Sequence, residues 1–418
     1  MSDFSNFKLG RSIQRGIEAA AFVEPRPIQT QTIPAALAGR DILGLAHTGT
    51  GKTAAFALPL LERLLAARRP GLRGLVVAPT RELVRQISEE ICTLARFTTI
   101  EVASIFGGVS QHRQIQALRK KPQVVVACPG RLLDLMQQQA LHLSQVEMLV
   151  LDEADHMFDM GFLPDLRRIL AALPAQRQNL LFSATMPREI RRLADDLLND
   201  PTVVDLAQSR PVATVAHALY PVEETHKFGL LEHVLASQRV KYAIVFTRTK
   251  HRAKRLAQQL DRSGHRAVAL QGNMSQPQRE RAMQGFRKHD FDILVATDIA
   301  ARGIDVACVS HVVNFDMPGT IDAYTHRIGR TGRSERQGTA YTFVTAADQS
   351  LVRAVERRLG SSIPVERWSA PRRRATPERS DANPTYPRAP RRHRRHAQPR
   401  NRGTGSPAGA ARGPRRQA

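Results

Sequence analysis

Residues 42–53 read ILGLAHTGTGKT, and this stretch sets the interpretation of the whole chain. Its first four residues are mostly apolar, as in a buried strand, and the alanine-rich sequence that follows residue 53 is typical of a helix. The loop between them fits the phosphate-binding loop pattern, except that Ala46 replaces its first glycine. A strand, a glycine-rich loop and a helix in this order bring backbone N–H groups against phosphate oxygens.

Each position of this loop has an expected role in a nucleotide site. Lys52 is long enough to reach the β and γ phosphates, and Thr53 offers a hydroxyl to Mg²⁺. The other residues of the loop are expected to contact the nucleotide: Ala46, His47, Thr48, Gly49, Thr50 and Gly51.

Residues 150–155 read VLDEAD and supply the acidic element that a nucleotide site requires. Asp152 is expected to hold Mg²⁺ through a water molecule, and Glu153 to accept the proton of the attacking water. Carboxylates are also favoured at a helix start, where they interact with the helix dipole. The buried apolar run directly before them favours the catalytic interpretation.

Short apolar runs alternate with helical stretches along the chain, which is typical of buried parallel strands. In the first half they lie at 42–46, 74–78, 124–127, 148–151 and 180–182. In the second half they lie at 243–246, 267–270, 293–296, 311–314 and 339–344. The pattern pauses around 201–215, so we predict two α/β domains joined by a short linker.

The positive charge is concentrated at the end of the chain. Residues 369–418 contain 14 arginines, no lysine and two acidic residues, so they carry +12 of the formal net charge of +24. Eight prolines and few large apolar residues mean that this segment cannot bury enough surface to fold, and we expect a disordered tail. Arginine clusters such as 391–395 favour a nucleic-acid-binding arm over a merely solubilising one.

The composition also limits the compartment and the cofactors. Cys92, Cys128 and Cys308 lie far apart, in no spacing that suggests a disulfide framework or a zinc site. No apolar run has the length of a membrane span, and the N-terminus lacks a signal-peptide pattern. We therefore expect a cytoplasmic protein without a membrane partner.

With these elements in place, the sequence resembles the DEAD-box RNA helicases, named for the tetrapeptide seen here at 152–155, over residues 4–345. The resemblance implies an α/β fold of two tandem RecA-like domains, each a mostly parallel sheet flanked by helices, with a basic C-terminal tail. The expected divisions are an ATP-binding domain at 1–207, a linker at 208–216, a helicase domain at 217–368 and the tail at 369–418.

Residues 22–29, FVEPRPIQ, look like the adenine-reading segment of that family. By resemblance, Gln29 hydrogen-bonds the adenine edge and Phe4 stacks on the ring, with Phe22 in the same site. Core packing is the alternative for Phe4. Arg26 stands where the family usually has a hydroxyl residue, which puts one hydrogen bond that supports the phosphate loop in doubt.

Most of the other family motifs follow an expected strand. By resemblance, Ser183 and Thr185 bind Asp155 and, with His326, couple the nucleotide site to the second domain. Cys128 stands where threonine is usual in one RNA motif. The RNA contacts that the resemblance implies are Pro79, Thr80, Arg81, Gly107, Gly108, Arg131, Thr247, Arg248, Gly272 and Thr297.

Two arginines near the end of the second domain complete the set. Arg327 and Arg330 are three residues apart, so they share one face if this segment is helical, and both are then expected to point at the γ-phosphate as arginine fingers. By resemblance, Gly303 lies near the same phosphate and Asp305 binds the ribose. Because Lys52 lies in the other domain, hydrolysis should require domain closure.

The resemblance implies an RNA-dependent ATPase that uses ATP and Mg²⁺ to separate short RNA duplexes or remodel ribonucleoprotein. Backbone and 2′-hydroxyl contacts imply little sequence preference. Ribosomal and RNA-decay proteins are candidate partners, and the short core with an arginine-rich tail resembles bacterial enzymes of the RhlE-like kind. The alternatives are a DNA translocase, against which segments 22–29 and 79–81 argue, and an RNA chaperone with an inactive nucleotide site, against which Lys52, Glu153 and Arg330 argue.

Removal of residues 369–418 should leave kcat at saturating RNA unchanged but raise the RNA concentration that is needed. A tethered basic arm adds affinity without adding chemistry, and each lost phosphate contact should flatten the slope of log affinity against log salt by about 0.7. ATPase titrations at several salt concentrations measure this, with a full-length variant carrying glutamine at the tail arginines as the matched control. Identical salt slopes for all three proteins would show that the tail does not touch RNA.

Overall fold

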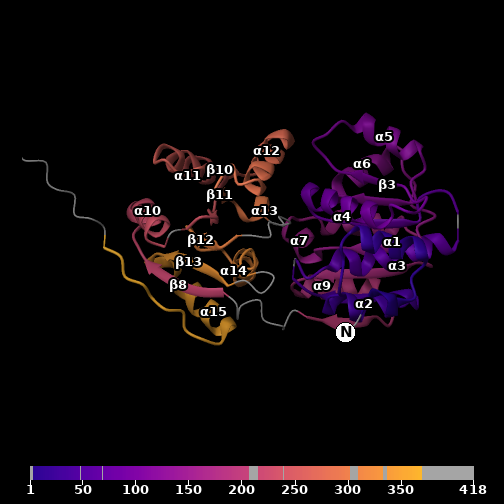
Figure 1. Cartoon of the computed structure of the whole chain (residues 1–418), viewed down its shortest axis with the longest axis horizontal. Helices are drawn as coiled ribbons and strands as arrows, with labels where there is room; N and C mark the ends of the chain where they lie inside the picture. Colours follow the sequence, from indigo (N-terminus) through magenta and orange to yellow (C-terminus); the bar gives the residue numbers. More distant parts are fainter. Residues whose placement is uncertain are drawn as a thin grey trace, which may run out of the picture. The chain divides into compact units, whose positions relative to one another are not determined.

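The computed structural model describes residues 3–47, 49–67, 69–206, 215–238, 240–301, 309–332 and 337–369. The expected tail from residue 370 onwards and most of the expected linker lie outside these ranges. The described chain contains two parallel sheets, each flanked by helices (Figure 1). The prediction of two α/β domains is therefore confirmed.

The first domain alternates strands and helices after three helical segments at its start. Its elements are η1 (Phe4–Phe7), α1 (Arg11–Ala19), α2 (Pro27–Leu37), β1 (Ile42–Leu45), α3 (Lys52–Ala66), β2 (Gly74–Val77), α4 (Arg81–Leu94), β3 (Val102–Ile105), α5 (Gln111–Arg119), β4 (Val124–Ala127), α6 (Pro129–Gln137), β5 (Met148–Leu151), α7 (Ala154–Asp159), α8 (Leu163–Ala171), β6 (Gln178–Ser183), α9 (Arg188–Leu197) and β7 (Thr202–Asp205). The seven strands lie in the order β3-β4-β2-β5-β6-β1-β7, and all are parallel.

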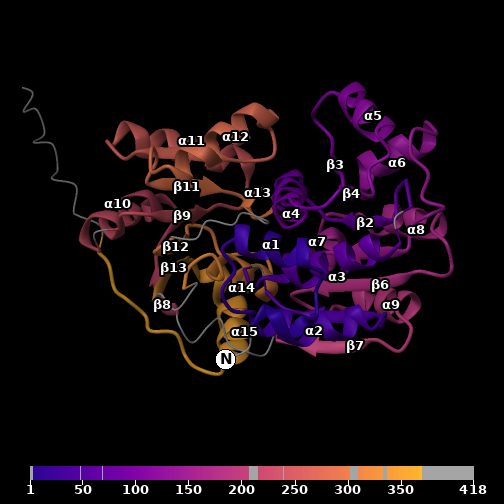
Figure 2. The same cartoon turned by 45° about the vertical axis from the view of Figure 1, so that its right-hand side comes forward.

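Helices cover both faces of this sheet, so successive residues of a central strand enter different cores (Figure 2). In β2, Val76 packs in the core that contains α1 to α4, whereas Leu75 and Val77 pack in the core that contains α6, α8 and α9. All three side chains are fully buried. A strand that is buried on both faces needs a continuous apolar run, and that run is what made the central strands predictable.

The second domain repeats this architecture with a smaller sheet. Its elements are β8 (Val215–Pro221), η3 (Glu224–His226), α10 (Lys227–Ser237), β9 (Ala243–Phe246), α11 (Lys250–Arg262), β10 (Ala267–Leu270), α12 (Gln276–Arg287), β11 (Ile293–Ala296), α13 (Asp298–Ala301), β12 (His311–Asn314), α14 (Ile321–Ile328), β13 (Gly338–Val344), η4 (Ala346–Asp348) and α15 (Gln349–Leu359). The order is β10-β11-β9-β12-β13-β8, again all parallel. In β9, Val245 faces the core that contains α10 and α11, and Phe246 faces the core that contains α12.

Three strands lie where the apolar pattern predicted none, and each is at the edge of a sheet. β3 and β7 form the two edges of the first sheet, and β8 forms one edge of the second. In β7, only Val204 is buried, and Val203 is 58% exposed. These three edge strands pack on fewer neighbours and lack the continuous apolar run of a central strand, whereas the remaining edge strand, β10, keeps one.

The predicted pause at 201–215 was therefore wrong in part. It contains β7 and the first residue of β8, and residues 215 and 216 of the expected linker pair with β13. At the other end of the domain, the Leu219 N–H donates to Pro364 O at 2.9 Å, and the Glu366 N–H donates to Leu219 O at 2.8 Å. Trp368 then packs beside His233 of α10, so the chain up to Trp368 belongs to the second domain.

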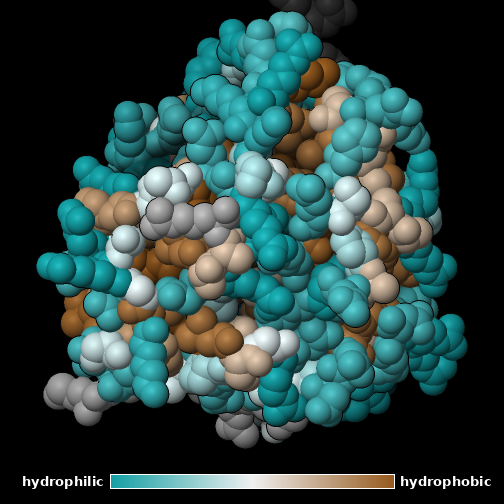
Figure 3. Space-filling view, turned by 90° about the vertical axis from the view of Figure 1, so that its right-hand side faces the viewer, coloured by the Kyte–Doolittle hydropathy of each residue, from teal (hydrophilic) through white to brown (hydrophobic). Residues whose placement is uncertain are grey.

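The surface is mixed in polarity. Figure 3 shows hydrophilic residues over most of one face, with hydrophobic residues in separate groups between them. Among the described residues, the exposed large hydrophobic side chains are Val23, Val109, Val203 and Val365. Within the same residues, no helix has the length and apolar character that crossing a membrane requires.

Arg73 is a buried cation that ties the loop after α3 to the start of β5. Its guanidinium forms a two-pronged pair with Glu147 at 2.7 and 2.9 Å, and it also donates to the carbonyls of Leu64 and Ala67. The hydrogen bond from Arg73 holds the pKa of Glu147 below its ordinary value. Arg73 is 2% exposed, so its contacts are largely shielded from water.

Replacing Arg73 with methionine should lower the free energy of unfolding by about 2–3 kcal/mol, because two carbonyls and a carboxylate lose a charged donor. Urea unfolding followed by far-UV circular dichroism measures the effect. The matched control is Arg40→Met, because the Arg40–Asp200 pair has side chains that are 51% and 93% exposed. This control should change stability by less than about 0.5 kcal/mol, and equal effects of the two substitutions would contradict the role of Arg73.

Candidate nucleotide and RNA site

The phosphate loop follows β1 and leads into α3. Gly49 and Gly51 have φ of 89° and 91°, in the left-handed region that favours glycine. A Cβ atom at position 51 would lie 2.6 Å from Nε2 of Gln29, so a side chain there would be strained by the positive φ and would also displace Gln29. The Lys52 ammonium donates to Ala46 O at 3.0 Å and lies 3.5 Å from Oδ1 of Asp152. The structure therefore brings the expected lysine and the expected carboxylate together.

The start of α2 supports this loop through the side chains of Arg26, its N-cap, and of Gln29. Gln29 accepts from the Arg26 N–H at 2.8 Å and donates from Nε2 to Gly51 O at 3.0 Å. The Arg26 guanidinium donates to Gly49 O at 2.5 Å. Sequence reasoning left a loop-supporting hydrogen bond in doubt at position 26. The structure shows that arginine makes a different one, to a carbonyl of the loop itself.

The two aromatic residues expected near adenine pack against each other. Phe4 lies in the first-domain core, 5% exposed, with its ring 6.0 Å from that of Phe22 and 5.8 Å from that of Phe7. In this structure Phe4 therefore makes the contacts of a core residue, which was the alternative to stacking on adenine. Phe22 packs on the edge of the same core.

The acidic segment follows β5, and its backbone is unusual. Glu153 has φ 52° and ψ 54°, a left-handed conformation that is uncommon for a residue with a side chain and is often found at functional sites. Burial raises the pKa of Asp152 above its ordinary value, because desolvation outweighs the attraction of Lys52. Burial also acts to raise the pKa of Glu153, but the hydrogen bond from His156 and nearby positive charges, including Arg330, hold that pKa below its ordinary value.

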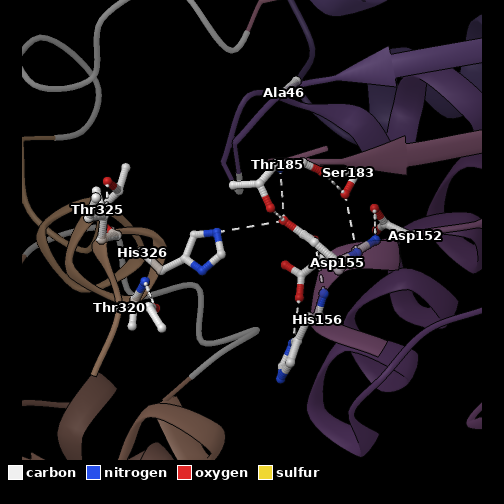
Figure 4. Close-up of polar contacts among 12 residues, drawn as sticks. Ala46, Asp152, Asp155, His156, Ser183, Thr185, Thr320, Thr325 and His326 are labelled. Carbon is white, nitrogen blue, oxygen red and sulfur yellow. Dashed lines mark hydrogen bonds and ion pairs between the residues drawn. The ribbon is translucent and has the colours of Figure 1, made fainter. Parts of the chain in front are cut away.

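Asp155 is the centre of a hydrogen-bonded group that joins several elements (Figure 4). Its Oδ2 accepts from both the backbone N–H and the hydroxyl of Thr185, each at 2.9 Å. Its backbone N–H donates to the Ser183 hydroxyl at 3.2 Å, so Ser183 binds the main chain and not the carboxylate. His326 of α14 lies with Nε2 3.8 Å from the same Oδ2. The four residues expected to couple the two domains are thus in one group.

Arg327 and Arg330 have different surroundings. Arg327 is 2% exposed and forms a two-pronged pair with Asp298 at 2.5 and 2.8 Å. It also donates to the Asn314 side chain at 3.2 Å and to Asp316 O at 2.6 Å, so its guanidinium is fully engaged within the second domain. Arg330 is close enough to Glu153 for its charge to lower the pKa of that carboxyl.

The expected RNA contacts of the first domain lie at the carboxyl edge of its sheet. Pro79 and Thr80 follow β2, and the Thr80 hydroxyl caps α4 by accepting from the Leu83 N–H at 3.3 Å. Arg81 lies over the turn at 107–108, where a Cβ atom on residue 108 would lie 1.9 Å from Nη1 of Arg81. Gly107 and Gly108 follow β3, and both therefore adjoin this arginine.

Two further residues of this edge belong to the start of α6. Arg131 has a side chain that is 14% exposed and lies 3.6 Å from Asp134. Burial raises the pKa of the Cys128 thiol to about 12, so this residue stays neutral where threonine was expected.

In the second domain the expected contacts again follow strands. Thr247 is fully buried and donates from its hydroxyl to Thr249 O at 3.3 Å. Arg248 has a largely exposed side chain, and its N–H donates to Asp316 at 2.9 Å. Gly272 follows β10 and is exposed, and Thr297 follows β11 and is half-buried. Three further predicted residues, Thr48, Gly303 and Asp305, lie outside the described residues.

Sequence reasoning missed several residues that hold this site together. His156 contacts Glu153, Asp298 holds Arg327, and Asp316 binds the Arg248 backbone and Lys227 Nζ at 3.1 Å. Each directly follows a strand or a predicted motif, and that position was the available signal. Arg279 of α12, which pairs with Glu82 of α4 at 2.7 Å, had no comparable signal.

Comparison with known proteins agrees with this geometry. The family description DEAD/DEAH box helicase matches residues 26–193, and Helicase conserved C-terminal domain matches residues 226–335. The DEAD-box ATP-dependent RNA helicase CshA of Bacillus subtilis is 42% identical over 354 residues, which cover 84% of this chain and 72% of that protein. The Geobacillus kaustophilus CshA is 43% identical over 358 residues, covering 85% and 76%.

Solved structures show the same fold. The Saccharomyces cerevisiae protein Dbp5, bound to RNA and ADP BeF3, superimposes with a TM-score of 0.79 at 32% identity, covering 88% of this chain and 96% of that one. The fold and site therefore define a helicase built from two tandem RecA-like domains, as the sequence predicted. Within that class, the chain belongs to the DEAD-box ATP-dependent RNA helicases.

Substituting alanine for Arg327 or for Arg330 should produce different defects. Arg327→Ala should lower the stability of the second domain by about 3 kcal/mol, because it breaks a buried ion pair with Asp298. Arg330→Ala should lower kcat by about 10³-fold or more with a smaller loss of stability. Urea unfolding followed by the fluorescence of Trp368, the single tryptophan, reports the second domain.

RNA-stimulated ATPase assays on the same two variants separate folding from chemistry. Under conditions in which it is still folded, the Arg327→Ala protein should keep much of the wild-type kcat. The Arg330→Ala protein should not, although it is folded. If Arg327→Ala abolished turnover without any loss of stability, Arg327 would act as an arginine finger despite its contacts in this structure.

Proposed function

We propose that this DEAD-box RNA helicase hydrolyses ATP with the group formed by Lys52, Asp152, Glu153 and Arg330, and uses hydrolysis to separate short RNA duplexes. The proposal is based on a continuous set of contacts. Lys52 pairs with Asp152 at the start of the segment 152–155, and Asp155 at its end contacts Thr185 and His326. A group that responds to phosphate at one end and contacts the second domain at the other can couple hydrolysis to domain closure.

The phosphate loop would bind ATP through its backbone and through Lys52. In this structure the Lys52 ammonium donates a hydrogen bond to Ala46 O and forms an ion pair with Asp152. The phosphates of a bound ATP can replace both partners. Gln29 lies beside this loop, with its amide already oriented by Arg26 and Gly51. Arg26 would keep the loop in its glycine-dependent conformation through the bond to Gly49 O.

The same residues fit a magnesium ion. The Asp152 carboxylate and the Thr53 hydroxyl are hard oxygen donors, and both side chains are buried at the phosphate loop. Among the described residues, no group of three or more acidic, histidine or cysteine side chains is arranged to hold a metal ion by itself. This agrees with Mg²⁺, which is usually held by one or two carboxylates together with substrate phosphates. When bound, the ion would neutralise charge on the phosphates.

Glu153 is the proposed general base, because it is a buried carboxylate that stays ionised. A base must be deprotonated when the attacking water arrives, and the low pKa of Glu153 ensures this at neutral pH. Arg330 would stabilise the charge that develops on the transferred phosphoryl group. The charge of Arg330 already acts on Glu153, which supports placing both residues at one site.

RNA would bind along the carboxyl edges of the two sheets. Three kinds of group along these edges suit contacts with phosphates and 2′-hydroxyls. The cations are Arg81, Arg131 and Arg248, the hydroxyls belong to Thr247 and Thr297, and the turn at 107–108 supplies backbone groups. Such contacts predict little sequence preference. We further propose that the enzyme is cytoplasmic and that it works with ribosomal or RNA-decay proteins.

Glu153→Gln should bind ATP and RNA with affinities within about threefold of the wild type, but lower kcat by about 10²-fold or more. The amide keeps the shape of the side chain and cannot accept the proton. Single-turnover ATPase assays and nucleotide and RNA titrations measure the two parts. The matched control is Glu101→Gln, an exposed glutamate, which should behave as the wild type. Wild-type turnover in Glu153→Gln would remove Glu153 from the mechanism.

A further inference from the structure

The residue that directly follows the acidic tetrapeptide has no role in the mechanism above. His156 is 2% exposed, and its Nδ1 lies 3.1 Å from Oε2 of Glu153, which is 6% exposed. Figure 4 shows the imidazole directed at this part of the site. A buried histidine in contact with the proposed base requires a structural or a mechanistic explanation.

The helix start at this point differs from an ordinary one. Glu153 is the N-cap of α7 and His156 is its third helical residue, so a side-chain oxygen of Glu153 would ordinarily accept from the His156 N–H. Here the His156 N–H donates to Oδ1 of Asp155 at 3.0 Å, and Glu153 makes no cap hydrogen bond. The Glu153 carboxylate is held by the imidazole instead of by the helix backbone.

The contact with Glu153 determines which ring nitrogen of His156 acts as the donor. With Glu153 as the base, its carboxylate oxygen Oε2 accepts, so Nδ1 of His156 donates. Nε2 is buried and has no hydrogen-bond partner among the described residues. Nδ1 is therefore the nitrogen through which His156 can hold the carboxylate.

We propose that His156 is a positioning residue for Glu153, whose carboxylate it holds in one orientation for proton transfer from the attacking water. The left-handed backbone at 153 directs the carboxylate away from the helix cap, and the Nδ1 donor fixes it there. The inference rests on the proposed role of Glu153 as the base. A base that loses its fixed orientation should become slower without any change in ligand binding.

A matched pair of variants tests this role. Leucine and asparagine have nearly the same shape, but only asparagine has an amide N–H close to the place of Nδ1. His156→Leu should lower kcat by about 10- to 100-fold, with KM for ATP and the RNA affinity within about twofold of the wild type. His156→Asn should retain kcat within about threefold. Wild-type kcat in His156→Leu, or equal losses in both variants, would overturn the proposal.

Two further measurements guard against misfolding and against failure of the mechanism itself. His156→Gln places its amide near Nε2 and not near Nδ1, so it should fold normally and still be as slow as His156→Leu. If it turned over as fast as the wild type, the donor at Nδ1 would be irrelevant. The double variant Glu153→Gln/His156→Leu should be no slower than Glu153→Gln alone, because His156 acts through Glu153.

These outcomes separate the two proposals. Normal turnover in Glu153→Gln rejects the base and its positioning residue together. A slow Glu153→Gln with a normal His156→Leu rejects only the positioning role. Additive losses in the double variant would show that His156 acts independently of Glu153, which also rejects it.

Discussion

The parallel alignment of the strands is the constraint on which the rest of this protein depends. Because every strand of a sheet runs in the same direction, every loop that follows a strand emerges at one edge. Helices bury both faces, so this edge is where polar side chains can meet a ligand. The neighbours β5, β6 and β1 then bring together Asp152, Ser183 and Lys52, which are distant in sequence. The seven-stranded order turns three separate motifs into one site.

The site holds buried polar groups in contacts that ligands can replace or reinforce. Lys52 donates to the Ala46 carbonyl and pairs with Asp152. The pKa of Glu153 is lowered although burial acts to raise it. Buried charges of this kind cost free energy unless they are paired and hydrogen-bonded. Their retention at one edge of an otherwise apolar core is consistent with a function in chemistry and not in stability. Asp155 joins this group to Thr185 and to His326 of the second domain.

Two arginines near the end of the second domain differ in their surroundings. Arg327 connects Asp298, Asn314 and the Asp316 carbonyl, so it fixes the loops after β11 and β12 relative to each other. Asp316 in turn holds the backbone of Arg248. The charge of Arg330, three residues further on, lowers the pKa of Glu153. Two arginines that the sequence pattern treats alike therefore differ in the groups that they affect.

The sequence by itself determined the fold class, the family, the central strands and the positions of most motif residues. It could do so because strands buried on two faces require continuous apolar runs, and because phosphate loops require glycines at fixed spacing. Only the tertiary structure revealed the edge strands β3, β7 and β8, which pack on fewer neighbours and so carry weaker patterns. It also decided that Arg26 hydrogen-bonds the phosphate loop and that Phe4 packs in the core. These contacts join residues that are far apart in the sequence, so the local sequence pattern does not predict them.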